Sequence, residues 1–268
     1  MSKFNEIKIK RFKATSPGIR GRVIVIDTTI NKKPSNKFFF RVLNRKKFTN
    51  STGNLVSFHR SFGNKKLYRI IDLKRIFFDF EAQVLNFEYD PNRNVSIALI
   101  QYENGSFSYI LKNNGLKIGD IIKSSLKTTS HIKIGDHMKL INIPVGTIIC
   151  NISEKNINTK GKYLRAAGMY GQLVLKKDGK NLVLFSSGRK KYFDDQSTAT
   201  IGIISGSQKK FTTIGKAGAN RWLGKRPHVR GVAMNPIDHP HGGGNGKSSG
   251  GRPSVSRWGK YTKGVVKK

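Results

Sequence analysis

Short stretches rich in β-branched and aromatic residues, separated by turn sequences, are the feature that most restricts the fold of this chain. Asn104-Gly105 and Asp178-Gly179 each separate two such stretches, and both pairs tolerate the positive φ angles of tight hairpins. No long helical patterns alternate with the strands, which argues against a parallel α/β enzyme. The sequence therefore predicts an all-β chain. The predicted strands are residues 66–72, 82–89, 95–102, 107–111, 144–151, 171–177, 181–185 and 198–204.

The predicted strands fall into two groups, which indicates two small barrels with extensions on both sides. Four strands in the first group suggest an oligonucleotide-binding barrel at 56–130. The second group predicts another compact barrel at 131–205, with a short helical turn at Tyr163–Met169. Residues 1–55 are a predicted basic N-terminal extension. Residues 206–268 are a predicted glycine-rich, basic C-terminal extension that is ordered only on its partner.

The charge of the chain indicates a polyanionic partner. Lysine and arginine number 51 against 15 acidic residues, a formal net charge of +36. Nucleic acid is favoured over a membrane surface, because the cations are spread along the chain and no apolar run approaches the roughly 18 residues that span a bilayer. Cys150 is the only cysteine, which excludes an internal disulfide and any multi-cysteine zinc site. We predict no cofactor and no membrane association.

A basic segment between Ile30 and Asn50 contains seven lysines and arginines and no acid. Phe38, Phe39, Phe40 and Phe48 are interleaved with these cations. A solvated arm that is disordered alone is one interpretation. An arm that folds on RNA through phosphate pairing and base stacking is the favoured one at this net charge.

The stretch from Gly231 to Lys247 carries the most distinctive chemistry. Two histidines surround Pro240, and three consecutive glycines follow, a pattern that excludes a regular helix or a central strand. A phosphate-binding P-loop is excluded because residue 241 is a histidine where that motif has glycine. A metal site would need a third protein ligand, and the only nearby acid is Asp238. RNA contact by these histidines explains them more simply than acid–base catalysis does.

Residues 230–244, RGVAMNPIDHPHGGG, resemble the signature of the second protein of the large ribosomal subunit, a family with bacterial and organellar members. Segments at 15–18, 66–75, 88–93, 142–146, 214–222 and 224–227 are similar to other parts of the family. The resemblance implies an oligonucleotide-binding barrel, an SH3-like barrel and extensions that reach into large-subunit rRNA. It also implies roles in subunit association and tRNA binding. By this resemblance, Met234, Asp238 and His239 match the family positions tied to peptidyl-transferase competence. In the family the rRNA carries out peptidyl transfer itself, so we predict that this chain is not an enzyme.

The expected partners are large-subunit rRNA, neighbouring ribosomal proteins, and the small-subunit and tRNA region. A free-standing single-strand RNA chaperone is the alternative from another class, and a histidine-dependent phosphodiesterase is a third. The predicted RNA-binding residues are Lys65, Lys66, Arg69, Lys216, Arg221, Trp222, Lys225, Arg226, Arg230, Asn235, His239, His241, Gly242, Gly243, Gly244, Lys247, Arg252, Trp258 and Lys263.

One segment departs from the family. Its usual His-x-Gly-Gly-Gly-His-Lys stretch is His59-Arg-Ser-Phe-Gly-Asn-Lys65 here, so that Gly63 is the only one of its glycines. Such drift favours a mitochondrial ribosome, in the matrix, over a plastid or the cytoplasm of a reduced bacterium.

Overall fold

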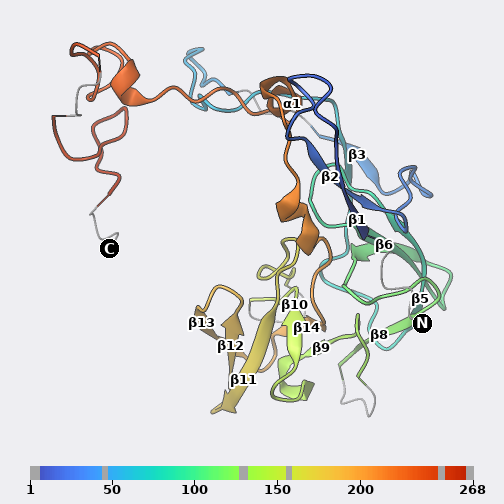
Figure 1. Ribbon diagram of the computed structural model, residues 1–268. Coiled ribbons are helices and arrows are strands. Elements are labelled where there is room, and N and C mark those ends of the chain that lie inside the picture. The colour runs from blue at the N-terminus through green and yellow to red at the C-terminus, as the bar shows by residue number, and fades with distance from the viewer. Residues whose placement is uncertain (1–6, 44–47, 127–131, 155–158, 247–250, 264–268) are drawn as a thin grey trace. The chain divides into compact units, whose positions relative to one another are not determined.

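The computed structural model describes residues 7–43, 48–126, 132–154, 159–246 and 251–263. The chain forms two compact units, each built from two stretches of sequence, and we describe them separately. Unit 1 comprises Met1–Arg45 and Lys65–Ala217, and unit 2 comprises Lys46–Asn64 and Gly218–Lys268. Figure 1 labels α1 and most of the strands.

Strands account for most of the regular structure of unit 1, which confirms the all-β prediction. Ten strands form one continuous sheet in the order β13-β12-β11-β10-β14-β9-β8-β5-β6-β7 (Figure 1). The strands of this sheet are β5 (Glu81–Glu88), β6 (Ile97–Tyr102), β7 (Phe107–Leu111), β8 (Ile121–Ser125), β9 (His137–Lys139), β10 (Ile148–Cys150), β11 (Gly171–Lys177), β12 (Lys180–Phe185), β13 (Lys190–Asp194) and β14 (Thr198–Ile201).

The sheet consists of an oligonucleotide-binding barrel followed by an SH3-like barrel. Antiparallel pairs build each part, whereas β8 and β9 pair in parallel, with Ser124 opposite His137 and Ser125 opposite Met138. This pair joins the two parts of the sheet.

Both predicted hairpins are confirmed. Gln101 on β6 pairs with Phe107 on β7 around Asn104-Gly105, and Gly105 has a φ of +77°. Lys177 on β11 pairs with Lys180 on β12, which leaves Asp178 and Gly179 as a two-residue turn. Both turn residues have positive φ, 49° and 72°, as a type I′ turn requires.

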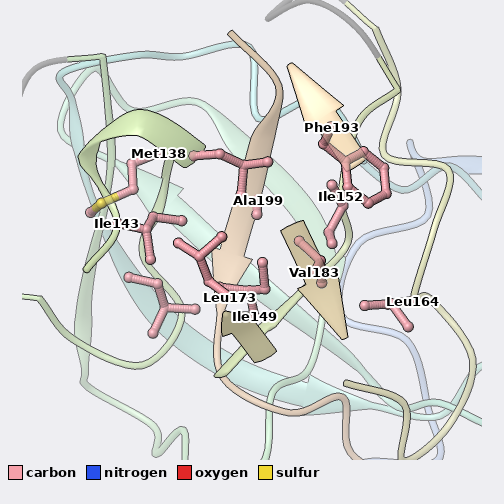
Figure 2. Packing of buried hydrophobic residues seen from close by; sticks show 11 residues of the cluster. Met138, Ile143, Ile149, Ile152, Leu164, Leu173, Val183, Phe193 and Ala199 are labelled. Atoms are coloured by element: carbon pink, nitrogen blue, oxygen red, sulfur yellow. The ribbon is translucent and has the colours of Figure 1, made fainter. Parts of the chain in front are cut away.

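Two clusters of buried side chains form the cores of the two barrels. Ala82, Val84 and Phe87 of β5 lie in the core of the first barrel with residues of β6, and a bulge between Val84 and Asn86 shifts the alternation so that Phe87 is buried. Figure 2 shows the core of the second barrel, where side chains from several strands meet. Its labelled members are Met138, Ile143, Ile149, Ile152, Leu164, Leu173, Val183, Phe193 and Ala199.

Two buried basic side chains of unit 1, Arg75 and His137, form hydrogen bonds inside the fold. Arg75, which is 2% exposed, donates from Nε to the hydroxyl of Ser124 at 3.1 Å and from Nη1 to the carbonyl of Gly135 at 3.3 Å. His137 lies within hydrogen-bonding distance of Thr200, with Nδ1 3.0 Å from Oγ1. Burial, with a smaller effect of the nearby Arg75, lowers the pKa of His137 to about 3, so this side chain is neutral in the folded chain.

The structure differs from the sequence prediction in several elements. The predicted helical turn at Tyr163–Met169 is wrong, because Tyr163 forms a β-bridge with Ile152 and Leu164 has a φ of 55°. The prediction missed β8, β9 and β13, and it missed the strands of the N-terminal region. Those strands are β1 (Ile7–Arg11) and β2 (Val23–Asp27), which pair with each other, and β3 (Phe40–Val42), which pairs with β4 (Leu67–Arg69). The domain boundaries at 55, 130 and 205 stay predictions.

The helical elements are short. They are η1 (Leu140–Asn142), η2 (Ser207–Phe211), α1 (Ala217–Trp222) and η3 (Gly231–Ala233). Among the described residues, no helix has the length and apolar character needed to cross a membrane.

Candidate nucleic-acid interface

Unit 2 is built on antiparallel pairing between residues 59–64 and residues 222–226. The N–H of Ser61 donates to the carbonyl of Gly224 at 2.8 Å, and the N–H of Asn64 donates to the carbonyl of Trp222 at 2.9 Å. The N–H of Arg226 donates to the carbonyl of His59 at 3.1 Å. The segment that departs from the family pattern is therefore joined by its backbone to the segment that carries Lys225 and Arg226.

A glycine is required at position 63, because its backbone has a positive φ and because the paired segment leaves no room for a side chain. It has a φ of +61°, and a Cβ there would lie 2.6 Å from the carbonyl oxygen of Trp222 and 2.7 Å from the nitrogen of Gly224. Gly224 is equally restricted, because its Cβ would lie 2.6 Å from the carbonyl oxygen of Ser61. The one glycine that this chain shares with the family stretch is thus a residue that the backbone pairing needs.

The paired segments bring two histidines together. Nδ1 of His59 is 3.4 Å from the carbonyl oxygen of Pro227, which can only accept. Nε2 of neutral His59 is therefore an acceptor, and Nδ1 of His228 donates to it at 2.9 Å. No sequence pattern pointed to His228, because a single sequence does not show which residue faces another 169 positions away.

Residues 234–243 form a tight loop after η3, held by its own backbone. The amides of Asp238 and His239 both donate to the carbonyl of Asn235, and the amide of Gly243 donates to the carbonyl of Met234 at 3.1 Å. A Cβ on Gly242 would lie 2.3 Å from the carbonyl oxygen of Asn235. Close packing inside the loop explains this glycine.

Two backbone amides fix the histidine rings of the loop. The N–H of His241 donates to Nδ1 of His239 at 3.0 Å, and the N–H of Val255 donates to Nε2 of His241 at 3.2 Å. Because these nitrogens accept, neutral His239 carries its proton on Nε2 and neutral His241 carries its proton on Nδ1. The ring of His239 is thus oriented by the next histidine, whereas the side chain of Asp238 is exposed.

Residues 254–262 form a second turn beside this loop. Val255 and Tyr261 form a β-bridge, and the N–H of Ser256 donates to the carbonyl of Lys260 at 2.7 Å. Trp258 lies in this turn and is 68% exposed. An exposed tryptophan beside cations is well suited to stacking on an unpaired base.

A cavity of about 760 Å³ lies between three segments of unit 2, residues 56–60, 228–239 and 255–262. His239 and Met234 line it on one side, and Arg60 and Arg257 add positive charge. The guanidinium of Arg257 lies 4.7 Å from the ring centroid of Phe58. Arg257 follows the signature in a basic stretch of sequence, whereas no sequence pattern pointed to Arg60.

The charge of unit 2 is almost entirely positive, with 14 lysines and arginines and a single acid, Asp238. This unit contains most of the predicted RNA-binding residues. Those that it exposes to solvent include Arg221, Trp222, Lys225, Arg226, Arg230, Asn235, Gly244, Arg252, Trp258 and Lys263, and half-buried are His239, His241, Gly242 and Gly243. Lys247 lies outside the described residues.

Four predicted RNA-binding residues lie in unit 1 instead. Lys65 and Lys216 are exposed, and Lys66 is half-buried. Arg69 is only 7% exposed, and its guanidinium lies 4.7 Å from the ring centroid of Phe40 and donates to the carbonyl of Leu67 at 3.0 Å. Arg69 thus contributes to packing between β3 and β4 rather than presenting a cation at the surface.

Metal coordination has no candidate site here. The described part of the chain contains no group of three or more histidine, cysteine, aspartate or glutamate side chains arranged to hold an ion. His239 and His241 use one ring nitrogen each to accept a backbone hydrogen bond.

Two family models match the chain. The model of the RNA-binding N-terminal domain of ribosomal proteins L2 matches residues 36–124, and the model of their C-terminal domain matches residues 133–259. The chain belongs to the ribosomal protein L2 family. It is a structural component of the large ribosomal subunit and binds rRNA.

Curated relatives support this assignment over nearly the whole chain. The large ribosomal subunit protein uL2 of Parvibaculum lavamentivorans is 44% identical over 256 residues, which cover 96% of this chain and 91% of that protein. The uL2 proteins of Rickettsia canadensis and Rickettsia prowazekii are each 46% identical, with coverage of 96% of this chain and 93% of theirs. The charge and the aromatic residues of unit 2 are therefore those of an rRNA-binding L2 protein.

Proposed function

We propose that the 234–243 loop supports the peptidyl-transferase region of the large subunit, with His239 as its rRNA-contacting residue. The observation that carries the proposal is the hydrogen bond from the His241 amide to Nδ1 of His239. It leaves Nε2–H as the donor of a neutral ring that is only half-buried. A phosphate oxygen or a 2′-hydroxyl of rRNA is a suitable acceptor.

Met234 and Asp238 belong to the same proposal. Met234 lines the cavity of unit 2 together with His239, and its carbonyl accepts the Gly243 amide that closes the loop. Asp238 is the only acid of unit 2 and is exposed. We infer that these two residues hold the loop in the form in which the His239 ring faces RNA.

The experiment compares two variants of His239 in large subunits assembled with the full chain. His239→Ala removes both ring nitrogens, whereas His239→Gln keeps one donor and one acceptor. A lost hydrogen bond to a buried RNA group costs about 1–3 kcal/mol, which is small beside the phosphate contacts that 14 lysines and arginines of unit 2 would make. Large subunits that contain His239→Ala are therefore expected to assemble but to transfer peptide slowly. Subunits that contain His239→Gln are expected to recover part of the rate of peptide transfer.

Two results would contradict this role. Normal peptide transfer by fully assembled alanine subunits would remove His239 from the function of the region. A chain that fails to enter subunits at all would make His239 an assembly residue.

We further infer that the chain contacts neighbouring ribosomal proteins, the tRNA region and the small subunit. We also infer that the chain works in a mitochondrial ribosome. The reduced glycine content of His59–Lys65 and the abundance of lysine, isoleucine and asparagine support that inference, while the relatives described above are bacterial. Fractionation of the source cells, with detection of the chain in mitochondrial or cytosolic large subunits, tests it.

A further inference from the structure

Unit 1 contains a second cavity, of about 350 Å³, and no residue of the histidine loop lines it. Its walls include β2, the segment Ile30–Lys32, Tyr89, which follows β5, and residues 205–209. The amide of Asn31 donates to the carbonyl of Phe87 at 2.8 Å, and the amide of Tyr89 donates to the carbonyl of Asn31 at 3.0 Å. This bridge holds Ile30 and Lys32 beside Tyr89.

One edge of β2 faces away from β1 and is only partly paired. The amide of Phe12 donates to the carbonyl of Arg22, which fixes the hydrogen-bonding alternation along the hairpin. Val23 therefore directs its N–H and C=O away from β1, and both pair with Thr213 at 3.0 Å. Val25, two residues further along, directs its N–H and C=O to the same side.

Val25 lines the cavity, and within the described residues no hydrogen bond is made to its N–H or C=O on that side. Val25 thus presents a backbone donor and a backbone acceptor side by side at the wall of a largely apolar cavity. These two groups can form hydrogen bonds with a planar ring that has an acceptor next to a donor on its edge. Nucleobases have such edges, with an acceptor beside a donor.

The charged residues of the cavity favour an anionic ligand. Nζ of Lys112 lies 3.9 Å from a carboxylate oxygen of Asp27 and donates to the hydroxyl of Thr29 at 3.1 Å, so these two charges offset each other. Lys32 and Lys209 also line the cavity, and no ion pair involves either of them among the described residues. Two cations therefore stay available to a phosphate.

Tyr89 supplies an aromatic face. It is 46% exposed, and Nζ of Lys209 lies 5.9 Å from its ring centroid. Stacking of a base on an aromatic ring is worth about 1–3 kcal/mol. Ile24, Ile26 and Ile30 complete the apolar walls.

We propose that this cavity binds one unstacked nucleobase of rRNA, with its face on Tyr89, its edge at the N–H and C=O of Val25, and its phosphate at Lys32 and Lys209. A peptide that pairs with the edge of β2 as an additional strand fits less well. Past the Val23–Thr213 pair, only Val25 and Asp27 of β2 direct backbone N–H and C=O groups away from β1. The proposal rests on rRNA binding by the L2 family and is independent of the role proposed for His239.

The first experiment locates the nucleotide. Large subunits assembled with the full chain are irradiated at a wavelength that crosslinks stacked aromatic residues to bases, and the adducts are mapped by mass spectrometry. We expect an adduct between Tyr89 and one rRNA nucleotide. A Tyr89 adduct to a peptide of another protein, or no adduct at Tyr89, would overturn the proposal.

The second experiment measures the coupling between Tyr89 and that base. The full chain binds an rRNA fragment that contains the mapped nucleotide, or the same fragment with an abasic site there. Tyr89→Leu is expected to weaken binding of the intact fragment about tenfold and to leave binding of the abasic fragment unchanged, while Tyr89→Phe keeps stacking and affinity.

Tyr192→Leu is the matched control, because Tyr192 is 60% exposed on β13 and lies outside the cavity. It is expected to bind both fragments as the wild type does. An equal loss on both fragments with Tyr89→Leu would show that Tyr89 acts on the protein alone, and the base site would then be wrong.

Discussion

The ring of His239 lies directly against Gly231, so closely that a Cβ on this glycine would come within 2.5 Å of Nδ1 and Cε1. The same Nδ1 accepts the amide of His241 at 3.0 Å. A residue at the start of the signature therefore sets the position of the histidine near its end, and the loop is one packed object rather than a string of separate contacts.

Replacement of Gly231 tests that relationship. Gly231→Ala forces the His239 ring to move, and overpacking of this kind costs about 1–3 kcal/mol. We expect the affinity of the full chain for deproteinised large-subunit rRNA to fall about tenfold, measured by filter binding at constant salt. Gly218→Ala is the control, because a Cβ there has no heavy atom within 4 Å and α1 gains helix propensity. Equal affinities for both variants would contradict the packing argument.

Gly63 gives a second comparison between two glycines of unit 2. Gly63 and Gly53 both have positive φ, +61° and +81°, so alanine is strained at either. Only at Gly63 would the Cβ meet backbone atoms, those of Trp222 and Gly224. On the rRNA-bound chain we expect Gly63→Ala to speed amide exchange at Ser61 and Arg226, and Gly53→Ala to leave these rates unchanged. Slow exchange in both variants would show that the pairing tolerates a side chain.

The positive charge of unit 2 predicts a specific salt dependence. Arg226 is exposed in unit 2, and Arg226→Gln removes one positive charge while keeping a long polar side chain. If it contacts one phosphate, the slope of log affinity against log salt becomes shallower by about 0.7, the value for single strands. Lys177→Gln is the control, because Lys177 precedes Asp178 at the exposed end of a hairpin. The measurement is the rRNA affinity of each variant at several salt concentrations, and an unchanged slope for Arg226→Gln would remove it from the interface.

His137 predicts how the stability of unit 1 depends on pH. Burial, together with a smaller effect of Arg75, lowers its pKa from 6.5 to about 3, so between these pH values the unfolded chain binds a proton that the folded chain excludes. The stability of the folded chain is therefore unaffected by protonation of His137 above pH 6.5 and decreases as the pH falls from 6.5 towards 3. The loss of unfolding free energy is about 2 kcal/mol at pH 5. His137→Gln, which is neutral throughout, is expected to lose correspondingly less stability between pH 7.5 and pH 5.

The unfolding free energy is measured in urea by far-ultraviolet circular dichroism, which follows the strands of unit 1. Tryptophan fluorescence would report on the other unit, since Trp222 and Trp258 both lie there. Parallel pH profiles for the wild type and the variant would show that His137 does not titrate on unfolding.

Local chemistry made the hairpins predictable. Asn104-Gly105 and Asp178-Gly179 form their turns because positive φ is accessible to these residues, whatever the surrounding structure. Strand β13 has little apolar pattern, which is why it escaped prediction: it reads KKYFD, and only Phe193 is buried in it. Its place depends on pairing with β12, from Lys180 opposite Asp194 to Leu184 opposite Lys190. Tyr163–Met169 was misread for a related reason, because a bridge to Ile152 overrode local helix preference.

The family and the polyanionic partner followed from the sequence by itself, since a net charge of +36 and the run RGVAMNPIDHPHGGG are properties of residue identity. Tertiary structure alone decided which atoms of these residues are free to act. The tautomers of His239 and His241 depend on amides that reach them in the folded loop. The need for Gly63 depends on Gly224, and the open edge at Val25 depends on where the Thr213 pairing stops. Each of these properties depends on a short distance between residues that are brought together by the fold, and the linear sequence does not specify such distances.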